Sequence, residues 1–273
     1  MSTIIWQSVI LGTVQGLTEF LPVSSSGHLH LVREFFFPNG LNTEDNLLFT
    51  VIVHGGTALA TVVIFYKDIL HIFKGLFKGK KDERQFALAI AVSMIPAAFV
   101  GFYFNDLINN FFEAGGGTTF LVAAMLVLTG LLLMLANRAK QTHKKVSTAD
   151  ALLIGVAQAI AILPGISRSG ATISTSVLLG IDRERAARFS FLMVVPLILG
   201  KMLLDSIELY ENPSAVDGQH LLPLLAGFTA AFITGLWACK AMINWVKKSN
   251  LSYFAFYCFA VGALATLGMA VHS

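Results

Sequence analysis

Charge is scarce in this chain of 273 residues: 13% are charged, against about 25% in soluble domains, and 55% are hydrophobic. A soluble fold of this length cannot bury so much apolar surface in one core, and a disordered chain has the opposite composition. The composition therefore excludes a soluble enzyme and indicates a membrane protein. Cysteine is also scarce. Cys239 and Cys258 lie in apolar stretches without ligand spacing, so neither a metal site nor a disulfide framework is expected from them.

Long apolar runs define the expected fold. No Lys or Arg precedes Arg33, so the apolar start of the chain lacks the basic region of a signal peptide. Six runs approach the roughly 20 residues that a spanning helix needs: 46–65, 86–104, 120–136, 189–209, 221–243 and 252–271. Two others, 4–32 and 151–181, are interrupted by polar clusters of Pro, Gly and Ser. Because irregular backbone at membrane depth must be buried in protein or line a wet cavity, both are predicted to be re-entrant helix-loop-helix hairpins. The sequence thus predicts an all-α polytopic membrane protein with six transmembrane helices and two hairpins.

The placement of the basic residues predicts the topology. All but three of the 19 Lys and Arg fall into four segments, 67–84, 138–145, 183–188 and 240–248. Two other connections, 105–118 and 205–220, carry only acidic charges. By the positive-inside rule the four basic segments are cytoplasmic and the two acidic ones are outside. Residues 1–137 and 150–273 then form two halves of opposite orientation within a single membrane domain.

The two interrupted runs also resemble each other, which indicates an inverted repeat. Three residues recur 143 positions later: Gly12 as Gly155, Gln15 as Gln158, and Gly27 as Gly170. Inverted repeats with broken helices place their site where the two halves meet near the midplane. The N-terminal ends of the short helices after the loops would there attract an anion.

Two ionisable residues stand out in these loops. Glu19 is the only acid in the apolar part of either interrupted run, and it shares one helix face with Gln15. Arg168 is the only cation in either run, and its planar guanidinium suits a phosphate or carboxylate. Ionisable residues at such depth indicate a functional site. The alternative, a purely structural ion pair between Glu19 and Arg168, stays open.

Hydroxyl and imidazole groups surround this pair in the sequence. Serines alone are weak indicators because they commonly cap helices, but here they are concentrated beside Glu19 and Arg168. The candidates for substrate binding are Gln15, Ser24, Ser26, Ser167, Ser169, Thr172 and His54. Ser25 and His28 are candidates for catalysis, with His28 as base, acid or nucleophile toward a phosphoryl group. No P-loop or Rossmann fingerprint is present, so the substrate is expected to bring its own anionic head. No nucleic acid is expected as a partner, since a net charge of +3 does not indicate one in a membrane protein.

Residues 15–28, QGLTEFLPVSSSGH, and 164–172, PGISRSGAT, resemble the two signature motifs of the bacterial undecaprenyl-pyrophosphate phosphatases, the bacitracin-resistance family. This resemblance implies an inner-membrane hydrolase that converts undecaprenyl pyrophosphate to undecaprenyl phosphate and inorganic phosphate for cell-wall synthesis. It implies Ser25 or His28 as the nucleophile and phosphate binding by Ser167, Arg168 and Thr172. It also implies dependence on a divalent cation, Mg²⁺ or Ca²⁺, with Glu19 as its ligand.

One departure from the family pattern limits the mechanism. The family's first motif has Glu or Gln at the position of Gln15, and this chain has Gln. Glu19 is therefore the single carboxylate on that helix, which argues against a mechanism or metal site that needs two acids there.

A second interpretation involves no chemistry. Inverted repeats, broken hairpins and a midplane site also describe secondary transporters, so a transporter or flippase for an anion or lipid phosphate is the alternative. The family resemblance implies a site open to the extracytoplasmic side, while the sequence leaves open which leaflet supplies the substrate. A homodimer is compatible with the sequence, which does not determine the oligomeric state.

Overall fold

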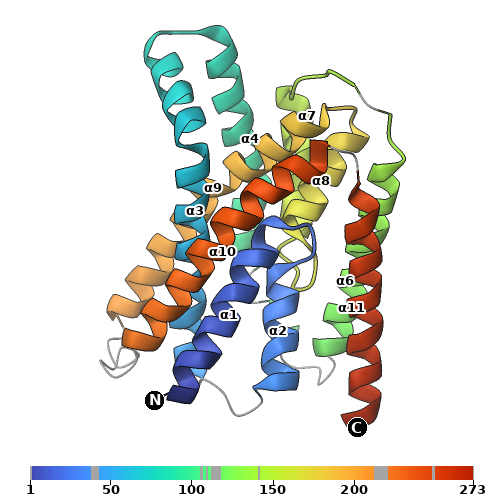
Figure 1. Cartoon of the computed structure of the whole chain (residues 1–273). Coiled ribbons are helices and arrows are strands. Elements are labelled where there is room, and N and C mark those ends of the chain that lie inside the picture. Colours follow the sequence, from blue (N-terminus) through green and yellow to red (C-terminus); the bar gives the residue numbers. More distant parts are fainter. Residues whose placement is uncertain are drawn as a thin grey trace.

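The computed structural model describes residues 2–37, 43–104, 107–108, 110–111, 118–140, 142–211, 221–247 and 250–272. Nearly all of this part of the chain is helical (Figure 1). Its helices are α1 (Ser2–Phe20), α2 (Ser25–Phe36), α3 (Thr43–Phe77), α4 (Lys81–Tyr103), α6 (Thr118–Asn137), α7 (Thr148–Ile160), α8 (Arg168–Leu178), α9 (Arg183–Glu211), α10 (Leu221–Lys247) and α11 (Leu251–His272). Apart from one isolated bridge between Lys144 and Ile181, the described residues form no β-structure. The predicted all-α class is confirmed.

Six helices within the described residues are long and apolar enough to cross a bilayer, and each overlaps one of the six predicted spans. They are Leu48–Phe77, Lys81–Tyr103, Thr118–Asn137, Arg183–Leu204, Leu221–Val246 and Leu251–Val271. The two interrupted runs are each broken into a pair of helices, α1 with α2 and α7 with α8. This arrangement is that of a multi-pass membrane protein.

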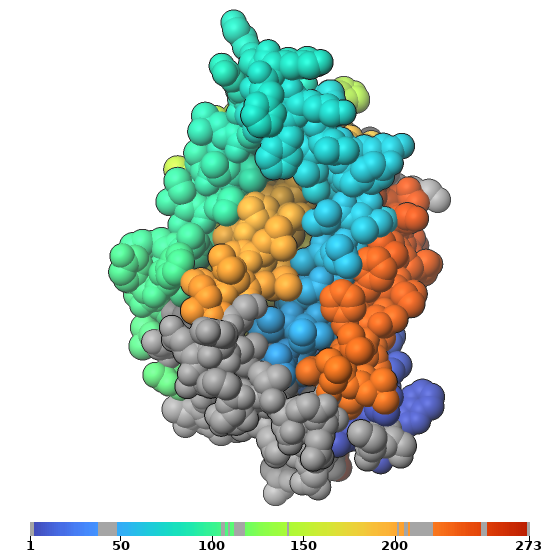
Figure 2. Space-filling view, turned by 90° about the vertical axis from the view of Figure 1, so that its left-hand side faces the viewer, coloured from blue at the N-terminus to red at the C-terminus, as the bar shows by residue number. Residues whose placement is uncertain are grey.

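The end of the first span differs from its prediction. Hydropathy ends this span at residue 65, whereas α3 continues to Phe77 and only kinks at Phe65, where φ is −100° and ψ is 15°. Hydropathy marks where apolar residues stop, but backbone hydrogen bonding continues while the following residues tolerate a helix. As a result the ends of α3 and α4 project beyond the rest of the molecule and carry the basic segment 67–84 (Figures 1 and 2).

Helices from the first part of the chain pack closely against helices from the second part. α1 packs along α10, α7 packs along α4, and α6 packs along α11. A Cβ added to Gly12 of α1 would lie 2.2 Å from the carbonyl oxygen of Gly227 in α10. A Cβ added to Gly155 of α7 would lie 2.4 Å from the carbonyl oxygen of Ser93 in α4. Glycine at these two positions therefore allows backbone contact between the helices, as small residues do in membrane interfaces.

The end of α1 is anchored by aromatic packing. α9 lies between α3 and α4 on the face shown in Figure 2. Its Phe191 ring lies 5.8 Å from the ring of Phe20 at the end of α1 and 6.0 Å from Phe65 at the kink of α3. All three rings are buried. Because Phe20 directly follows Glu19, this packing holds the helix end that carries the candidate acid.

Replacing Gly12 by Ala should destabilise the protein. The added methyl group must displace α1 from α10, and overpacking of this kind costs about 1–3 kcal/mol. The matched control is Gly101→Ala, where an added Cβ meets nothing within 4 Å. Thermal unfolding in detergent should show a lower Tm for Gly12→Ala and an unchanged or higher Tm for Gly101→Ala. Equal Tm values for the two variants would contradict the close packing of α1 on α10.

Candidate active site

The connections α1–α2 and α7–α8 share one N-cap hydrogen bond. Ser24 precedes α2, and its Oγ accepts a hydrogen bond of 3.2 Å from the N–H of Gly27. Ser167 precedes α8, and its Oγ accepts one of 3.0 Å from the N–H of Gly170. A serine hydroxyl at this position satisfies an N–H that the helix leaves unpaired. The spacing Ser-x-x-Gly thus forms the same capping hydrogen bond in both loops, although Ser24 has a φ of 70° and Ser167 a φ of −74°.

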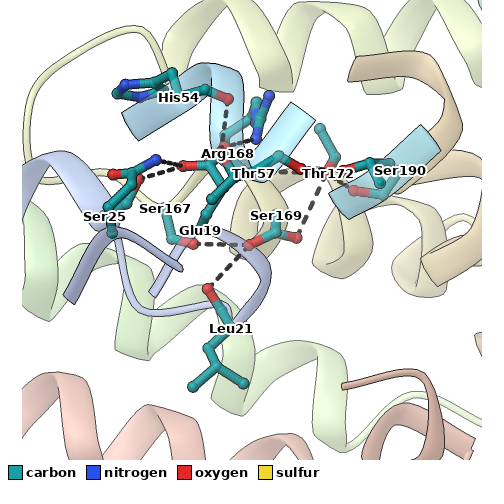
Figure 3. Close-up of polar contacts among 12 residues, drawn as sticks. Glu19, Leu21, Ser25, His54, Thr57, Ser167, Arg168, Ser169, Thr172 and Ser190 are labelled. Carbon is teal, nitrogen blue, oxygen red and sulfur yellow. Dashed lines mark hydrogen bonds and ion pairs between the residues drawn. The ribbon is translucent and has the colours of Figure 1, made fainter. Parts of the chain in front are cut away.

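Glu19 is the centre of a buried polar network that joins three helices. Its Oε2 accepts hydrogen bonds from Gln15 Nε2 at 3.0 Å and from Ser25 Oγ at 2.6 Å. Its Oε1 forms an ion pair with the guanidinium of Arg168 (Figure 3). The Glu19 side chain is 6% exposed, whereas that of Arg168 is 25% exposed. The acid is therefore enclosed, and the guanidinium remains accessible to an anion.

Hydroxyl groups hold the second loop against the first. Ser169 Oγ donates to the carbonyl oxygen of Leu21 at 3.1 Å and lies 3.3 Å from Ser167 Oγ (Figure 3). Thr172 Oγ1 lies 2.6 Å from the hydroxyl of Ser190 in α9 and donates to the Arg168 carbonyl at 2.9 Å. Ser169 and Thr172 thus fasten the start of α8 on two sides and hold the backbone of Arg168 in place.

The remaining candidates lie around this network. Ser26 is exposed, and its hydroxyl lies 3.3 Å from that of Ser24. His54 lies on α3 beside the network (Figure 3), and its Nδ1 is 2.8 Å from the carbonyl oxygen of Thr50 in the same helix. The structure therefore brings Gln15, Glu19, Ser25 and Arg168 into direct contact and leaves Ser26 and His54 at the edge.

His28 has a different environment. Its Nδ1 lies 2.7 Å from the carbonyl oxygen of Ser24, and its Nε2 lies 2.9 Å from the hydroxyl of Tyr257 in α11. Both ring nitrogens are engaged by these two groups rather than by Glu19 or Arg168. Ser24 has a φ of 70°, in the left-handed region that a serine rarely adopts. His28 therefore contacts the strained residue that precedes Ser25.

Three residues that contact the loops were not recognised from the sequence: Thr129, Ser190 and Tyr257. Thr129 in α6 accepts a hydrogen bond of 3.0 Å from the backbone N–H of Ser167. Each carries a hydroxyl group and lies within a predicted span. Because a hydroxyl in a membrane helix can bond to its own backbone, its presence there indicates no particular partner. Only the neighbouring helices reveal their roles.

The residues present fit a metal ion only in part. No group of three or more His, Cys, Asp or Glu that could hold a metal occurs in the part of the chain that the structure describes. Glu19 is the carboxylate at the site, and both of its oxygens already accept hydrogen bonds. Mg²⁺ in phosphoryl-transfer sites is commonly bound by one or two carboxylates together with substrate phosphates. Glu19 therefore fits a cation that is bound chiefly by the substrate, and does not fit a site formed by protein ligands alone.

Known proteins match this chain over nearly its whole length. The family model described as bacitracin resistance protein BacA matches residues 8–264. A protein of Christiangramia forsetii named undecaprenyl-diphosphatase is 54% identical over 264 residues, which cover 96% of this chain and 97% of that protein. Proteins of the same name from Bacteroides thetaiotaomicron and Carboxydothermus hydrogenoformans are 48% and 41% identical, over 96% and 94% of this chain and 97% and 94% of their own lengths. The matched region contains both polar loops, and the chain belongs to the BacA family of bacitracin resistance proteins.

Proposed function

We propose that this protein is an undecaprenyl-diphosphatase, a membrane hydrolase that releases inorganic phosphate from undecaprenyl pyrophosphate and returns undecaprenyl phosphate to cell-wall synthesis. The names of its relatives support this activity. The observation that carries the proposal is the Ser25 hydroxyl, which donates to the buried carboxylate of Glu19 while the Arg168 guanidinium pairs with the other oxygen of that carboxylate. A nucleophile, its base and a phosphate-binding cation are then in one place.

The proposed reaction begins at Ser25. Its Oγ attacks the terminal phosphorus of the pyrophosphate, and its proton passes to Glu19 Oε2, which already accepts that hydrogen bond at 2.6 Å. The bond from the terminal phosphorus to the bridging oxygen breaks, and undecaprenyl phosphate leaves with the electron pair. Water then attacks the phosphorus of the phosphoserine, and the bond from phosphorus to Ser25 Oγ breaks. Ser25 Oγ regains its proton from Glu19, and inorganic phosphate leaves with both protons of the water.

Charge stabilisation in this scheme comes from the second loop. A guanidinium has five N–H donors, so Arg168 can keep Glu19 on one edge and bind phosphate oxygens with another. The starts of α2 and α8 add backbone N–H groups, which favour anions. We assign Ser167, Ser169, Ser24 and Ser26 to the walls that orient the pyrophosphate, and Thr172 to holding Arg168.

For His28 we propose a positioning role rather than nucleophilic attack. Its nitrogens are engaged by Ser24 and Tyr257, so neither is free for a phosphorus atom in this arrangement. By binding the Ser24 carbonyl, His28 maintains the strained turn that places Ser25 beside Glu19. His54 is proposed to line the entrance, and Gln15 to orient the Glu19 carboxylate.

A divalent cation, Mg²⁺ or Ca²⁺, is proposed to accompany the pyrophosphate. Glu19 and the substrate phosphates would hold it, and when bound it would neutralise charge on the phosphate oxygens. In the scheme above the protein's own residues perform each proton transfer.

We further propose that the two halves, residues 1–137 and 150–273, form an inverted repeat in which α1–α2 and α7–α8 are re-entrant hairpins. Two observations support this arrangement. Ser24 and Ser167 form matching N-cap hydrogen bonds, and the first helix of each half packs on a helix of the other half, α1 on α10 and α7 on α4. The protein is proposed to lie in the inner membrane with its site open to the extracytoplasmic side. A homodimer is a further proposal, and light scattering of the purified protein in detergent tests it.

The activity is tested with purified protein in detergent micelles, where no transmembrane gradient exists. With undecaprenyl pyrophosphate and Mg²⁺, we expect release of one inorganic phosphate for each undecaprenyl phosphate formed. Folded protein that releases no phosphate would refute the hydrolase and favour the transporter. A Ser25→Ala sample purified in the same way shows whether a contaminating phosphatase contributes.

A further inference from the structure

A tyrosine of the last helix contacts His28 in the first turn of α2, directly after the loop that joins α1 to α2. The hydroxyl of Tyr257 in α11 lies 2.9 Å from Nε2 of His28, and the two rings lie within 7° of parallel with centroids 5.5 Å apart. Tyr257 is separated from His28 by 229 residues in sequence, so only the fold brings them together. His28 is buried, whereas Tyr257 is 45% exposed. The half-exposed side chain of Tyr257 therefore forms a hydrogen bond with a buried histidine.

The partners of the imidazole determine which nitrogen carries the proton. Nδ1 lies 2.7 Å from the Ser24 carbonyl oxygen, which can only accept a hydrogen bond, so Nδ1 must be protonated. In the neutral ring Nε2 is then an acceptor, and the Tyr257 hydroxyl is the donor that faces it. The two hydrogen bonds lie on opposite sides of the ring and together fix its orientation. Such a contact through the second nitrogen is how proteins commonly fix a functional histidine.

The second loop is held in a corresponding way. Thr129 in α6 accepts a hydrogen bond from the backbone N–H of Ser167, and Thr129 is fully buried. On the first loop, the thiol of Cys258, the residue after Tyr257, lies 3.7 Å from the carbonyl oxygen of Pro22. The α1–α2 loop is therefore held by α11, the last helix of the second half, and the α7–α8 loop by α6, the last helix of the first half. Because both loops are held in this way by a helix of the other half, we infer that the contacts of Tyr257 help to position the residues of the site.

We propose that Tyr257 is a positioning residue of the active site that acts through His28. Its hydroxyl occupies Nε2, so Nδ1–H stays on the Ser24 carbonyl, the left-handed turn at Ser24 persists, and Ser25 Oγ stays directed at Glu19. This inference rests on the proposed role of Ser25 as the nucleophile. Because Tyr257 does not touch the phosphate-binding groups, its loss affects kcat rather than KM.

Steady-state kinetics of a double-mutant cycle test this inference. Tyr257→Phe keeps the ring and removes one hydrogen bond, and we expect kcat to fall about three- to tenfold with KM changed less than about twofold. In a His28→Ala background the same substitution should change kcat less than about twofold, because its target is absent. The matched control is Tyr253→Phe, one helical turn earlier on α11 and 70% exposed, which should leave both constants unchanged. A normal kcat for Tyr257→Phe, or an equal loss in both backgrounds, would overturn the inference.

A spectroscopic measurement separates this inference from the proposed reaction. In protein labelled with ¹⁵N-histidine, the His28 resonances are identified by their loss in His28→Asn. We expect one protonated and one unprotonated ring nitrogen in the wild type, and a shift of the unprotonated resonance in Tyr257→Phe but not in Tyr253→Phe. An unchanged His28 spectrum in Tyr257→Phe would overturn the inference even if the enzyme is active. A wild type that releases no phosphate refutes the proposed function while leaving this spectrum as the test of the contact.

Discussion

Replacing Arg168 by Ala is expected to lower phosphate release from undecaprenyl pyrophosphate by about a thousandfold or more, the range that loss of a transition-state arginine produces. Arg168 is the cation that reaches the network of Glu19 and keeps part of its guanidinium exposed. Without it the site loses the guanidinium that stabilises the negative charge of the phosphoryl group in the proposed reaction. The loss is measured as kcat/KM of the purified variant in detergent.

Two further variants separate chemistry from folding. Arg168→Lys keeps a positive charge beside Glu19 but lacks the fork that binds two oxygens, so its activity should also fall strongly while its Tm stays close to that of the wild type. Arg188 is the matched control, because it pairs with Asp68 in another arginine–carboxylate contact, between α9 and α3. Arg188→Ala should retain activity. If Arg168→Lys were as active as the wild type, the guanidinium would have only the structural role of an ion pair.

Replacing Ser25 by Ala should have an effect of similar size, with kcat reduced about a thousandfold or more, because the substitution removes the proposed nucleophile. The substitution removes one oxygen atom and leaves the ion pair between Glu19 and Arg168, so the protein should remain folded. Ser93→Ala is a suitable control, since Ser93 is buried and donates only to the Ile90 carbonyl of its own helix. Rapid acid quenching of the wild type with labelled substrate should trap phosphate on Ser25, and the Ser25→Ala protein should trap none.

Quenching the same labelled reaction in alkali as well as in acid decides between Ser25 and His28, because phosphoserine survives acid whereas phosphohistidine survives only alkali. A positioning histidine predicts that His28→Ala retains measurable activity and still forms the phosphoserine. A nucleophilic histidine predicts the reverse, with Ser25→Ala retaining substantial turnover and label appearing on His28. Label on His28 would therefore refute the proposed mechanism and leave the hydrolase activity itself intact.

The sequence predicted the membrane-spanning helices well because their signal is local. Twenty apolar residues in succession satisfy their own backbone hydrogen bonds and need no partner to be recognised. The apolar run 46–65 did not show that α3 continues to Phe77, because hydropathy records the solvent of the side chains and the helix does not end where the apolar residues end. The side of the membrane, the hairpins as re-entrant elements and the repeat stay predictions.

The candidate site was predictable at the positions where a charged residue occurs within an apolar run. Glu19 and Arg168 stood out because charge is costly inside a membrane, and the structure places them in one ion pair. The sequence did not show that Ser25, among several neighbouring serines, donates to Glu19, because adjacent residues at a helix start point in different directions. Nor did it show that His28 turns toward α11.

The sequence by itself determined the class of this protein, its spanning helices and the two loops that carry its polar residues, since each of these follows from composition and from neighbours along the chain. Only the tertiary structure decided how the loops are joined. The contacts of Glu19 with Arg168, of His28 with Tyr257 and of Ser167 with Thr129 connect residues that are far apart in sequence. Such contacts depend on how α1 packs on α10, α7 on α4 and α6 on α11, and this packing depends on side-chain shapes that no single segment contains.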